Sequence, residues 1–553
     1  MSSEDTPSEG TQDPTSEFWA DEAARRVVEN DRPPVVKGGV SPSGVPHIGN
    51  FNEVLRGAFV VRALESRDDV DAPKQIFTSD DRDPLRRVPD TVLSPEGDVV
   101  ELDEEERDEL RDHLGKPYVD VPSPFADVAG APDTWADHFS SFLREDSERL
   151  DVPVEFVSND ETYREGGFDE PVRAALENLE TSREVIARHQ RTAGEGYVPF
   201  MPICSECGRI TTTPTEVNLE DETVEYVCDD AELAGKYEVE GCGHRGTATF
   251  REGKLPWRFE WPAQWWTHGV GFEPFGKDHA EGSWESGVEI AREVYGTEPP
   301  EPLVYEFFLV DGEKMSASEG NVYTVSDILS YVEPSVLRYF FALDPKKQRD
   351  LSLAEVHHLV NDFDRIEDAH YGREDPADTQ ERLYAERVYD DLRTDDPEDH
   401  EPIRPTYTFA AMVGVAEDDD ARLDALGRAG HLPDDPTDAQ RDDALRRVEL
   451  ARNWALDFDN EYAVRVLDDR PDTDFDDDTR AAFADLADVV ESGASPDEIQ
   501  NAVFETAREH DLGVGDFFSD GYRLFLGQDS GPKLGPLLAA LDRGFVVERL
   551  RSA

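Results

Sequence analysis

Two short segments of this chain carry side chains suited to binding phosphate groups. Residues 46–50 read PHIGN and lie between a Pro- and Gly-rich turn and a helical pattern. The first turn of a helix presents free backbone N–H groups that bind anions, and His47 and Asn50 would add side-chain donors there. Gly49 has no Cβ, so a flat ring can approach the backbone closely. Taken alone, the segment is equally well explained as a capped helix start with an incidental histidine.

The second segment, residues 314–318, reads KMSAS and begins about 265 residues after the first. Lys314 supplies a flexible cation, and Ser316 and Ser318 supply hydroxyl groups. A mobile loop of this kind can close over a polyphosphate, and an ordinary polar loop is the alternative. Together and in this order, the two segments favour phosphate chemistry more strongly than either does alone.

Both segments are expected at turns of a parallel α/β sheet. Residues 35–40 read VVKGGV, a short strand that enters the turn before PHIGN, and a helix is expected from about His47 to Leu64. Strand, glycine-rich turn, helix and strand in succession are typical of a βαβ unit. We expect further strands at residues 74–78, 154–157 and 303–309, and further helices at residues 133–150 and 286–295.

Other regions differ in composition. Residues 1–16 are polar and are expected to form a disordered leader that is neither a signal peptide nor a transit peptide. Residues 90–112 are acid-rich with few apolar side chains, which predicts a surface insertion. After about Pro345 the strand patterns fade and helical stripes replace them. No apolar run approaches the ~18 residues of a transmembrane helix, so no membrane association is expected.

All four cysteines of the chain lie within a segment of about 40 residues. Cys204 and Cys207 form a CxxC pair, and Cys228 and Cys242 complete the set, with His244 as a substitute ligand. In a reducing compartment, such clustering favours a structural Zn²⁺ site over disulfides. Buried free cysteines, or a degenerate site without metal, are the alternative.

The chain is strongly acidic. Its 553 residues include 126 Asp and Glu against 55 Lys and Arg, a formal net charge of −71. A compact body with this charge repels itself in dilute salt, whereas at molar salt the Debye length falls to about 3 Å. Because the acidic residues are spread along the chain, we interpret the charge as adaptation to a salt-loaded cytoplasm, in preference to a site for a basic partner.

The two phosphate segments resemble the HIGH and KMSKS signatures of class I aminoacyl-tRNA synthetases. Asn50 stands at the fourth HIGH position and Ala317 at the fourth KMSKS position. The form HIGN, preceded by GVSPSG at residues 39–44, is similar to the class I lysyl-tRNA synthetases, which are found mainly in archaea and some bacteria. Further stretches that match this family lie at residues 79–86, 255–262, 273–279 and 531–535.

The resemblance implies a fold and a reaction. The implied fold is α/β, a class I Rossmann-type parallel sheet with a zinc-ribbon-like insertion, followed by an α-helical anticodon-binding domain. The implied reaction is ATP-dependent aminoacylation of tRNA(Lys) with L-lysine through lysyl-adenylate, by a cytoplasmic enzyme expected to be a monomer. The implied division is a leader at 1–16, catalytic halves at 17–200 and 251–344, the insertion at 201–250 and the helical domain at 345–553.

The resemblance also implies roles for single residues. Lys314 would hold the β- and γ-phosphates of ATP, and Mg²⁺ would be carried mostly by ATP oxygens and water. A lysine substrate brings two ammonium groups and an aliphatic stem, which suit carboxylates and an aromatic wall. The residues implied for ATP binding and catalysis are His47, Gly49, Asn50, Lys314, Met315, Ser316 and Ser318. The candidates for the lysine pocket are Gly39, Ser41, Trp257 and His279 by resemblance, and Tyr305 and Glu306, with Asp80, Asp81 and Asp83 as alternatives, from their chemistry.

Three other hypotheses stay open. A glutamyl-like class I synthetase would want a basic residue near the strand end where Ser41 stands. An adenylyltransferase without tRNA is usually shorter. A tRNA-binding zinc-ribbon protein without activity would carry both phosphate segments as relics. In the helical part, Arg446, Arg447 and Arg452 either touch RNA phosphates or pair with nearby acids.

Overall fold

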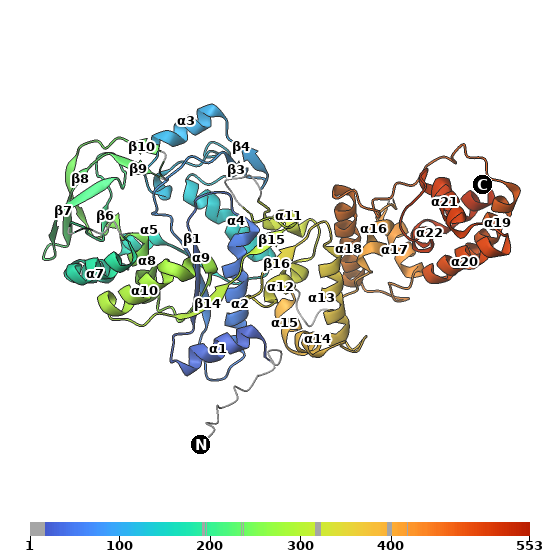
Figure 1. The fold of residues 1–553 in the computed structure, drawn as a ribbon, viewed down its shortest axis with the longest axis horizontal. Helices are drawn as coiled ribbons and strands as arrows, with labels where there is room; N and C mark the ends of the chain where they lie inside the picture. The colour runs from blue at the N-terminus through green and yellow to red at the C-terminus, as the bar shows by residue number, and fades with distance from the viewer. Residues whose placement is uncertain are drawn as a thin grey trace, which may run out of the picture. The chain divides into compact units, whose positions relative to one another are not determined.

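A five-stranded parallel sheet forms the centre of the N-terminal part of the chain in the computed structural model (Figure 1). The strand order is β14-β13-β1-β2-β5, and every neighbouring pair is parallel. Both faces of such a sheet are covered, so its strands are apolar and buried; all five residues of β13 are buried. The strands are β1 (Val35–Val40), β2 (Lys74–Ser79), β5 (Glu155–Ser158), β13 (Phe272–Gly276) and β14 (Glu301–Tyr305).

The structure describes residues 17–190, 194, 196–233, 235, 237–315, 322–394, 401–416 and 418–553. The chain divides into two units. The first unit runs to Ser326 and includes Phe341–Leu351, and the second comprises Asp327–Phe340 and Ser352–Ala553. The boundary expected at residue 345 therefore falls inside a segment that belongs to the first unit. Among the described residues, no helix is long and apolar enough to cross a membrane.

The helices of the first unit begin with α1 (Trp19–Glu29) and α2 (Phe51–Glu65), which pack on each other, and α2 also packs on β1. The helix expected from His47 starts with a 3₁₀ turn at Ile48–Asn50. The other helices are α3 (Glu104–Asp112), α4 (Trp135–Arg149), α5 (Asn159–Glu165), α6 (Asp169–Glu177), α7 (Leu179–His189), α8 (Trp257–His268), α9 (Lys277–His279) and α10 (Glu285–Ile290), the last flanked by π-turns Ala280–Trp284 and Ala291–Tyr295.

The single strand expected at residues 303–309 is wrong, because the segment contains two strands in different sheets. β14 ends at Tyr305, the backbone N–H of Glu306 then donates to the Pro345 carbonyl at 2.9 Å, and β15 (Phe308–Val310) begins a second sheet. Its partner is the parallel strand β16 (Arg349–Leu351), which lies in a region where only helices were expected. The bond to Pro345 turns the chain away from the central sheet.

The acidic stretch at residues 90–112 is more than a surface insertion. It contains β3 (Thr91–Leu93), β4 (Val99–Glu101) and α3. Its few apolar side chains, among them Val92 and Leu110, are buried in a cluster with Trp135 of α4 and with Val239 from the cysteine segment. A few apolar residues suffice for a small core when neighbouring elements supply the other apolar side chains.

The cysteine segment is a small antiparallel region. β7 pairs with β8, and β8 with β11, while β6 and β12 pair at the base of the segment. The strands are β6 (Met201–Pro202), β7 (Thr212–Asn218), β8 (Thr223–Cys228), β9 (Ala231–Leu233), β10 (Tyr237–Val239), β11 (Arg245–Thr249) and β12 (Gly253–Lys254).

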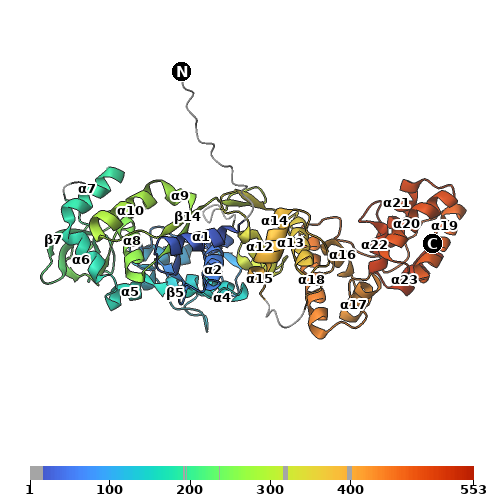
Figure 2. The ribbon, with the colours of Figure 1, turned by 90° about the horizontal axis from the view of Figure 1, so that it is seen from below.

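The second unit consists of helices joined by loops, with no strand among its described residues (Figure 2). Side-chain caps start several of its helices: Thr437 and Gln440 form a capping box at α18, and Ser495 and Glu498 form another at α20. The helices wholly within it are α13 (His357–His370), α14 (Thr379–Leu383), α15 (Tyr389–Leu392), α16 (Tyr407–Val413), α17 (Asp419–Arg428), α18 (Asp438–Asp457), α19 (Asp477–Glu491), α20 (Pro496–Glu509), α21 (Val514–Leu526), α22 (Leu534–Ala540) and α23 (Arg543–Arg551), with a π-turn at Tyr384–Val388. Two helices cross the division between the units, α11 (Val325–Leu329) and α12 (Pro334–Ala342).

Candidate active site

The PHIGN segment forms a rigid turn between β1 and α2. The Gly49 N–H donates to His47 Nδ1 at 3.0 Å, and the His47 N–H donates to Asn50 Oδ1 at 2.9 Å. Because Nδ1 accepts a hydrogen bond, the proton of the neutral ring lies on Nε2, which is left to act as a donor. Burial lowers the pKa of His47 to about 4, so the ring is neutral near pH 7. The Nδ2 amide of Asn50 is a second donor at this turn.

Gly49 permits a close approach at this turn by the histidine ring itself. A Cβ at this position would lie 2.6 Å from His47 Cε1 and 3.4 Å from the terminal methyl of Met315. Any larger residue would therefore push the imidazole out of its place over the backbone.

The two phosphate segments meet in the folded chain. Met315, the second residue of KMSAS, lies beside Gly49, and the Ile48 N–H donates to the Tyr323 carbonyl at 2.8 Å. Lys314 is exposed, with its ammonium 4.1 Å from the centre of the Phe307 ring. Ser316 and Ser318 lie outside the described residues. The described part of KMSAS therefore places the exposed Lys314 one residue from the contact between Met315 and the PHIGN turn.

A small cavity lies beside the carboxyl ends of β1, β2 and β13. Its volume is about 30 Å³, close to the share of one water molecule in the liquid. The lining includes three of the residues predicted for a lysine pocket, Gly39, Trp257 and His279, and one of the alternatives, Asp80. The other lining residues are Lys37, Glu53, Thr78, Trp261, Gln264, Glu273 and Phe275.

The single ammonium group in this lining is already neutralised. Lys37 Nζ lies 2.8 Å from Glu273 Oε1, and both side chains are almost completely buried. The indole N–H groups of Trp261 and Trp265 also donate to the Glu273 carboxylate, the former at 2.8 Å. This carboxylate is therefore held as part of the core.

Glu53 is a second lining carboxylate, and it has no cation within ion-pair distance among the described residues. Its Oε2 accepts from the Gly39 N–H at 2.8 Å, and its Oε1 accepts from the Tyr305 hydroxyl at 3.3 Å. Burial raises the pKa of Glu53 to about 7. A buried carboxylate with this pKa at a cavity is typical of a functional site.

Asp80 is the third lining carboxylate. Its Oδ1 accepts from the side-chain amides of Asn159 at 2.8 Å and Gln264 at 3.0 Å. Burial, followed by the nearby charges of Asp83 and Glu260, raises the pKa of Asp80 well above its usual value. Glu53 and Asp80 thus form no ion pair among the described residues, although the charge of Lys37 lies near both.

Aromatic side chains close the cavity on one side. Trp257 stacks on Trp261 with ring centroids 5.3 Å apart, and the His279 ring lies 6.2 Å from Trp257 and 5.7 Å from Trp261. Trp257 and His279 are only half-buried, whereas Trp261 is buried. The stacked pair offers a flat apolar wall to a ligand.

The other predicted pocket residues lie at or beyond the edge of the cavity. The Ser41 hydroxyl donates to Asp83 Oδ2 at 3.4 Å, and Asp83 is paired with the buried Lys254. Tyr305 is buried, and its hydroxyl donates to Glu53 Oε1, but Tyr305 is not part of the lining. Glu306 forms an ion pair with Lys277 on a partly exposed surface and is not part of the lining.

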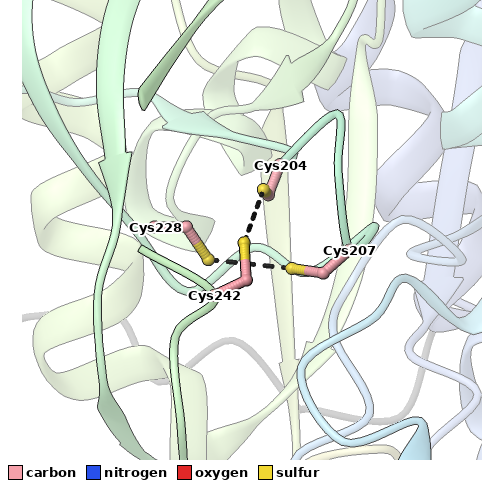
Figure 3. Close-up of side chains that lie close together, drawn as sticks. All are labelled: Cys204, Cys207, Cys228 and Cys242. Atoms are coloured by element: carbon pink, nitrogen blue, oxygen red, sulfur yellow. Dashed lines mark hydrogen bonds between the residues drawn. The ribbon is translucent and has the colours of Figure 1, made fainter. Parts of the chain in front are cut away.

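The four cysteines converge at one point (Figure 3). Sγ of Cys204 lies 3.6 Å from that of Cys242, and Sγ of Cys207 lies 3.7 Å from that of Cys228. All four sulfur atoms lie within 4.8 Å of one another. His244 Nε2 instead lies 3.2 Å from the Ser205 hydroxyl. Of the two ligand sets considered from the sequence, the structure brings together the four thiols.

Comparisons with known proteins agree on one family. A family model described as "tRNA synthetases class I (K)" matches residues 17–390. A lysine–tRNA ligase of Natronomonas pharaonis is 50% identical over 537 residues, and the match covers 97% of each chain. The chain belongs to the class I lysine–tRNA ligases. A family member from Halobacterium salinarum is 49% identical, covering 97% of this chain and 96% of its own. Another from Pyrococcus horikoshii is 33% identical, covering 96% and 99%.

For a class I lysine–tRNA ligase, sequence reasoning missed one prominent residue. Glu53 comes three residues after Asn50 on α2, a helix in which most side chains are apolar and buried. An acid in the first turn of an apolar helix next to PHIGN was the available signal. An acid at this position usually complements the helix dipole at the surface, so its place in the sequence does not by itself indicate a site.

Proposed function

We propose that this protein aminoacylates tRNA(Lys) with L-lysine in an ATP-dependent reaction through lysyl-adenylate. Membership of the lysine–tRNA ligase family supports the reaction. The single observation that carries the choice of amino acid is the pair of unmatched carboxylates, Glu53 and Asp80, in one cavity. The two ammonium groups of lysine match them in number and sign.

The same cavity argues against glutamate as the substrate. A glutamate side chain would need a free cation, whereas Lys37 is paired with Glu273. A third carboxylate placed beside Glu53 and Asp80 would be buried with no free cation to pair with. The charge of the lining therefore supports lysine over glutamate.

The cavity must open for a lysine to enter. Its volume of about 30 Å³ has room for one water molecule and not for an amino acid. Trp257 and His279 are the half-buried aromatic side chains of the lining, and their outward movement would open the cavity in this proposal. In this proposal Trp257 then covers the aliphatic stem of the bound lysine.

The PHIGN turn is proposed to stabilise the transition state of adenylation. A carboxylate oxygen of lysine attacks the α-phosphorus of ATP, the bond to the bridging oxygen breaks, and pyrophosphate leaves. His47 Nε2–H and Asn50 Nδ2–H would donate to phosphate oxygens, and Lys314 would hold the departing pyrophosphate. The neutral, fixed tautomer of His47 makes it a donor without a proton transfer. Mg²⁺, carried mainly by ATP oxygens and water, would neutralise part of the phosphate charge.

A structural Zn²⁺ at the four cysteines is part of the proposal. Tetrahedral ligation with Zn–S bonds of about 2.3 Å places sulfur atoms about 3.8 Å apart. Two of the sulfur pairs, at 3.6 and 3.7 Å, lie close to this spacing, and all four sulfur atoms lie within 4.8 Å of one another. The ion would hold the loops of the cysteine segment together.

The transfer step and the setting complete the proposal. A terminal hydroxyl of tRNA attacks the lysyl carbonyl, and AMP leaves with the proton delivered to solvent. The helical second unit would bind the anticodon region, and the protein would act as a monomer in the cytoplasm. The resemblance described above supports these points.

Exchange of pyrophosphate with ATP tests the proposed reaction. The assay is run in molar KCl with each amino acid in turn, with and without tRNA. We expect exchange with lysine; if it appears only when tRNA is added, activation is tRNA-assisted. Exchange with glutamate would overturn the assignment of the pocket. Absence of exchange by the folded protein under every condition would favour a tRNA-binding protein without activity.

A further inference from the structure

A cavity of about 720 Å³ lies on the helical unit, beside α17 and α18. Three guanidinium groups line it, from Arg422 on α17 and from Arg446 and Arg452 on α18. Such a concentration of guanidinium groups stands out in a chain with a net charge of −71. Arginine is the side chain best suited to phosphate recognition.

Arg452 is held in place with part of its hydrogen-bonding capacity unused. The side chain is half-buried, and its Nη2 donates to the Val464 carbonyl at 3.0 Å. Its Nη1 is buried and has no partner among the described residues. Burial, with the nearby charges of Arg465 and Arg422, lowers the pKa of Arg452. An anion in the cavity would accept a hydrogen bond from the unused Nη1–H group of Arg452. It would also reduce the repulsion between Arg452 and the neighbouring guanidinium groups.

The backbone makes room for this side chain. A Cβ at Gly414, directly after α16, would lie 2.7 Å from Arg452 Cβ and 2.9 Å from its Cγ and Cδ. The stem of Arg452 therefore packs on a bare stretch of backbone, which fixes the direction of the guanidinium.

Acidic residues also line the cavity, but they do not neutralise the arginines of α18. Asp419 pairs with Arg422 at 2.9 Å. Asp442 and Glu449 also line the cavity, and neither forms an ion pair with Arg446 or Arg452 in the described structure. Arg447, the neighbour on the same helix, is completely buried and paired with Glu333 and Asp364. The three arginines considered from the sequence thus divide into one structural residue and two available cations.

We propose that the cavity lined by Arg422, Arg446 and Arg452 receives backbone phosphates of the bound tRNA. The inference rests on the proposed function, since it names where that RNA is held. Contacts to phosphate carry no base information, so they position the tRNA without reading its sequence. Arg446 is exposed and would contact the RNA first. Arg452, whose side chain is held in place by packing on Gly414, is half-buried in the cavity.

Binding of tRNA(Lys) to the full chain over a series of KCl concentrations tests the inference. We expect Arg452→Gln and Arg446→Gln each to weaken binding about fivefold, and to reduce the slope of log K against log[KCl] by about 0.7–0.9. The KM values for lysine and ATP should stay unchanged. A non-cognate tRNA should lose affinity by the same factor.

Arg508→Gln on α20 is the matched control, because Arg508 is also exposed and forms no ion pair in the described structure. It should bind tRNA as the wild-type protein does. Because Arg446 is exposed, its substitution leaves the packing intact and keeps the test valid should Arg452→Gln fail to fold. If Arg446→Gln and Arg452→Gln leave the tRNA affinity and its salt slope unchanged, the inference is overturned. The proposed function would still stand in that case, provided that the wild-type protein lysylates tRNA. Failure of wild-type lysylation would overturn the function itself.

Discussion

At the scale of single residues, the partner of a carboxylate decides what it can do. Glu273 and Glu53 line the same cavity, yet Glu273 is paired with Lys37, whereas Glu53 meets only the Gly39 N–H and the Tyr305 hydroxyl. A cationic ligand gains little near a carboxylate that already has a cation. It gains more from a carboxyl group that forms no ion pair and that ionises near neutral pH, as Glu53 does with its pKa of about 7.

The pKa of about 7 gives Glu53 a testable pH signature. An ammonium group binds the ionised form, so lysine binding requires Glu53 to lose its proton. Below pH 7, we expect the KM for lysine to rise about tenfold for each pH unit. Glu53→Gln should raise this KM and abolish its pH dependence between pH 6 and 8, with the KM for ATP nearly unchanged. Steady-state lysylation at several pH values measures both effects.

The control for this variant lies on the same helix. Glu65 ends α2 and is exposed, so Glu65→Gln should keep the wild-type lysine KM and its pH profile. A wild-type pH profile in Glu53→Gln would show that another group binds the ammonium.

At the scale of elements, the cysteine segment lacks a large core of its own. Its buried cluster consists of Cys204, Tyr226, Cys228 and Ala248. So small a cluster leaves the loops that carry Cys207 and Cys242 with little apolar packing. Segments with small cores commonly depend on a metal ion for stability.

Removal of the proposed Zn²⁺ should therefore loosen this segment first. We expect one equivalent of zinc per chain by atomic absorption, and its loss in Cys207→Ser. Limited proteolysis should then cut between β6 and β12 before it cuts the central sheet. Ser205→Ala, which changes a residue between two cysteines that is not a ligand, should retain the metal. Full zinc content in Cys207→Ser would contradict the four-thiol site.

At the scale of the whole molecule, the acidic charge is spread over both units. Many of the arginines form surface ion pairs, for example Arg188 with Glu289 and Glu293. With 126 acidic residues and 55 basic ones, such pairs still leave most carboxylates without a cation. Their mutual repulsion opposes folding unless salt screens it.

The net charge of −71 predicts a requirement for high salt. We expect the helical circular dichroism signal at 222 nm to be native-like in molar KCl and to fall on dialysis into dilute buffer. The melting temperature should rise with KCl concentration. Equal signals and melting temperatures in dilute and molar KCl would contradict the role given to the charge.

Local patterns predicted much of the fold. The strands at β1, β2 and β5 and the helix α4 lie within a residue or two of their expected bounds. Their signals are short apolar runs and caps, which depend on neighbours in sequence. The errors have a different origin. The break after Tyr305 depends on a bond to Pro345, and the core under residues 90–112 depends on Trp135 and Val239. These partners are distant in sequence, so a pattern of neighbouring residues does not reveal them.

The sequence by itself determined the chemistry that local spacing encodes. The PHIGN turn, the KMSAS segment, the four cysteines and the charge all follow from residue types and their order. Only the tertiary structure decided which charged groups are free to act. It placed Glu53, and not Glu306, in the lining of the cavity, and it showed that Arg447 is fully ion-paired whereas Arg452 is not. The physical reason is that the behaviour of a charged group depends on its burial and on partners distant in sequence.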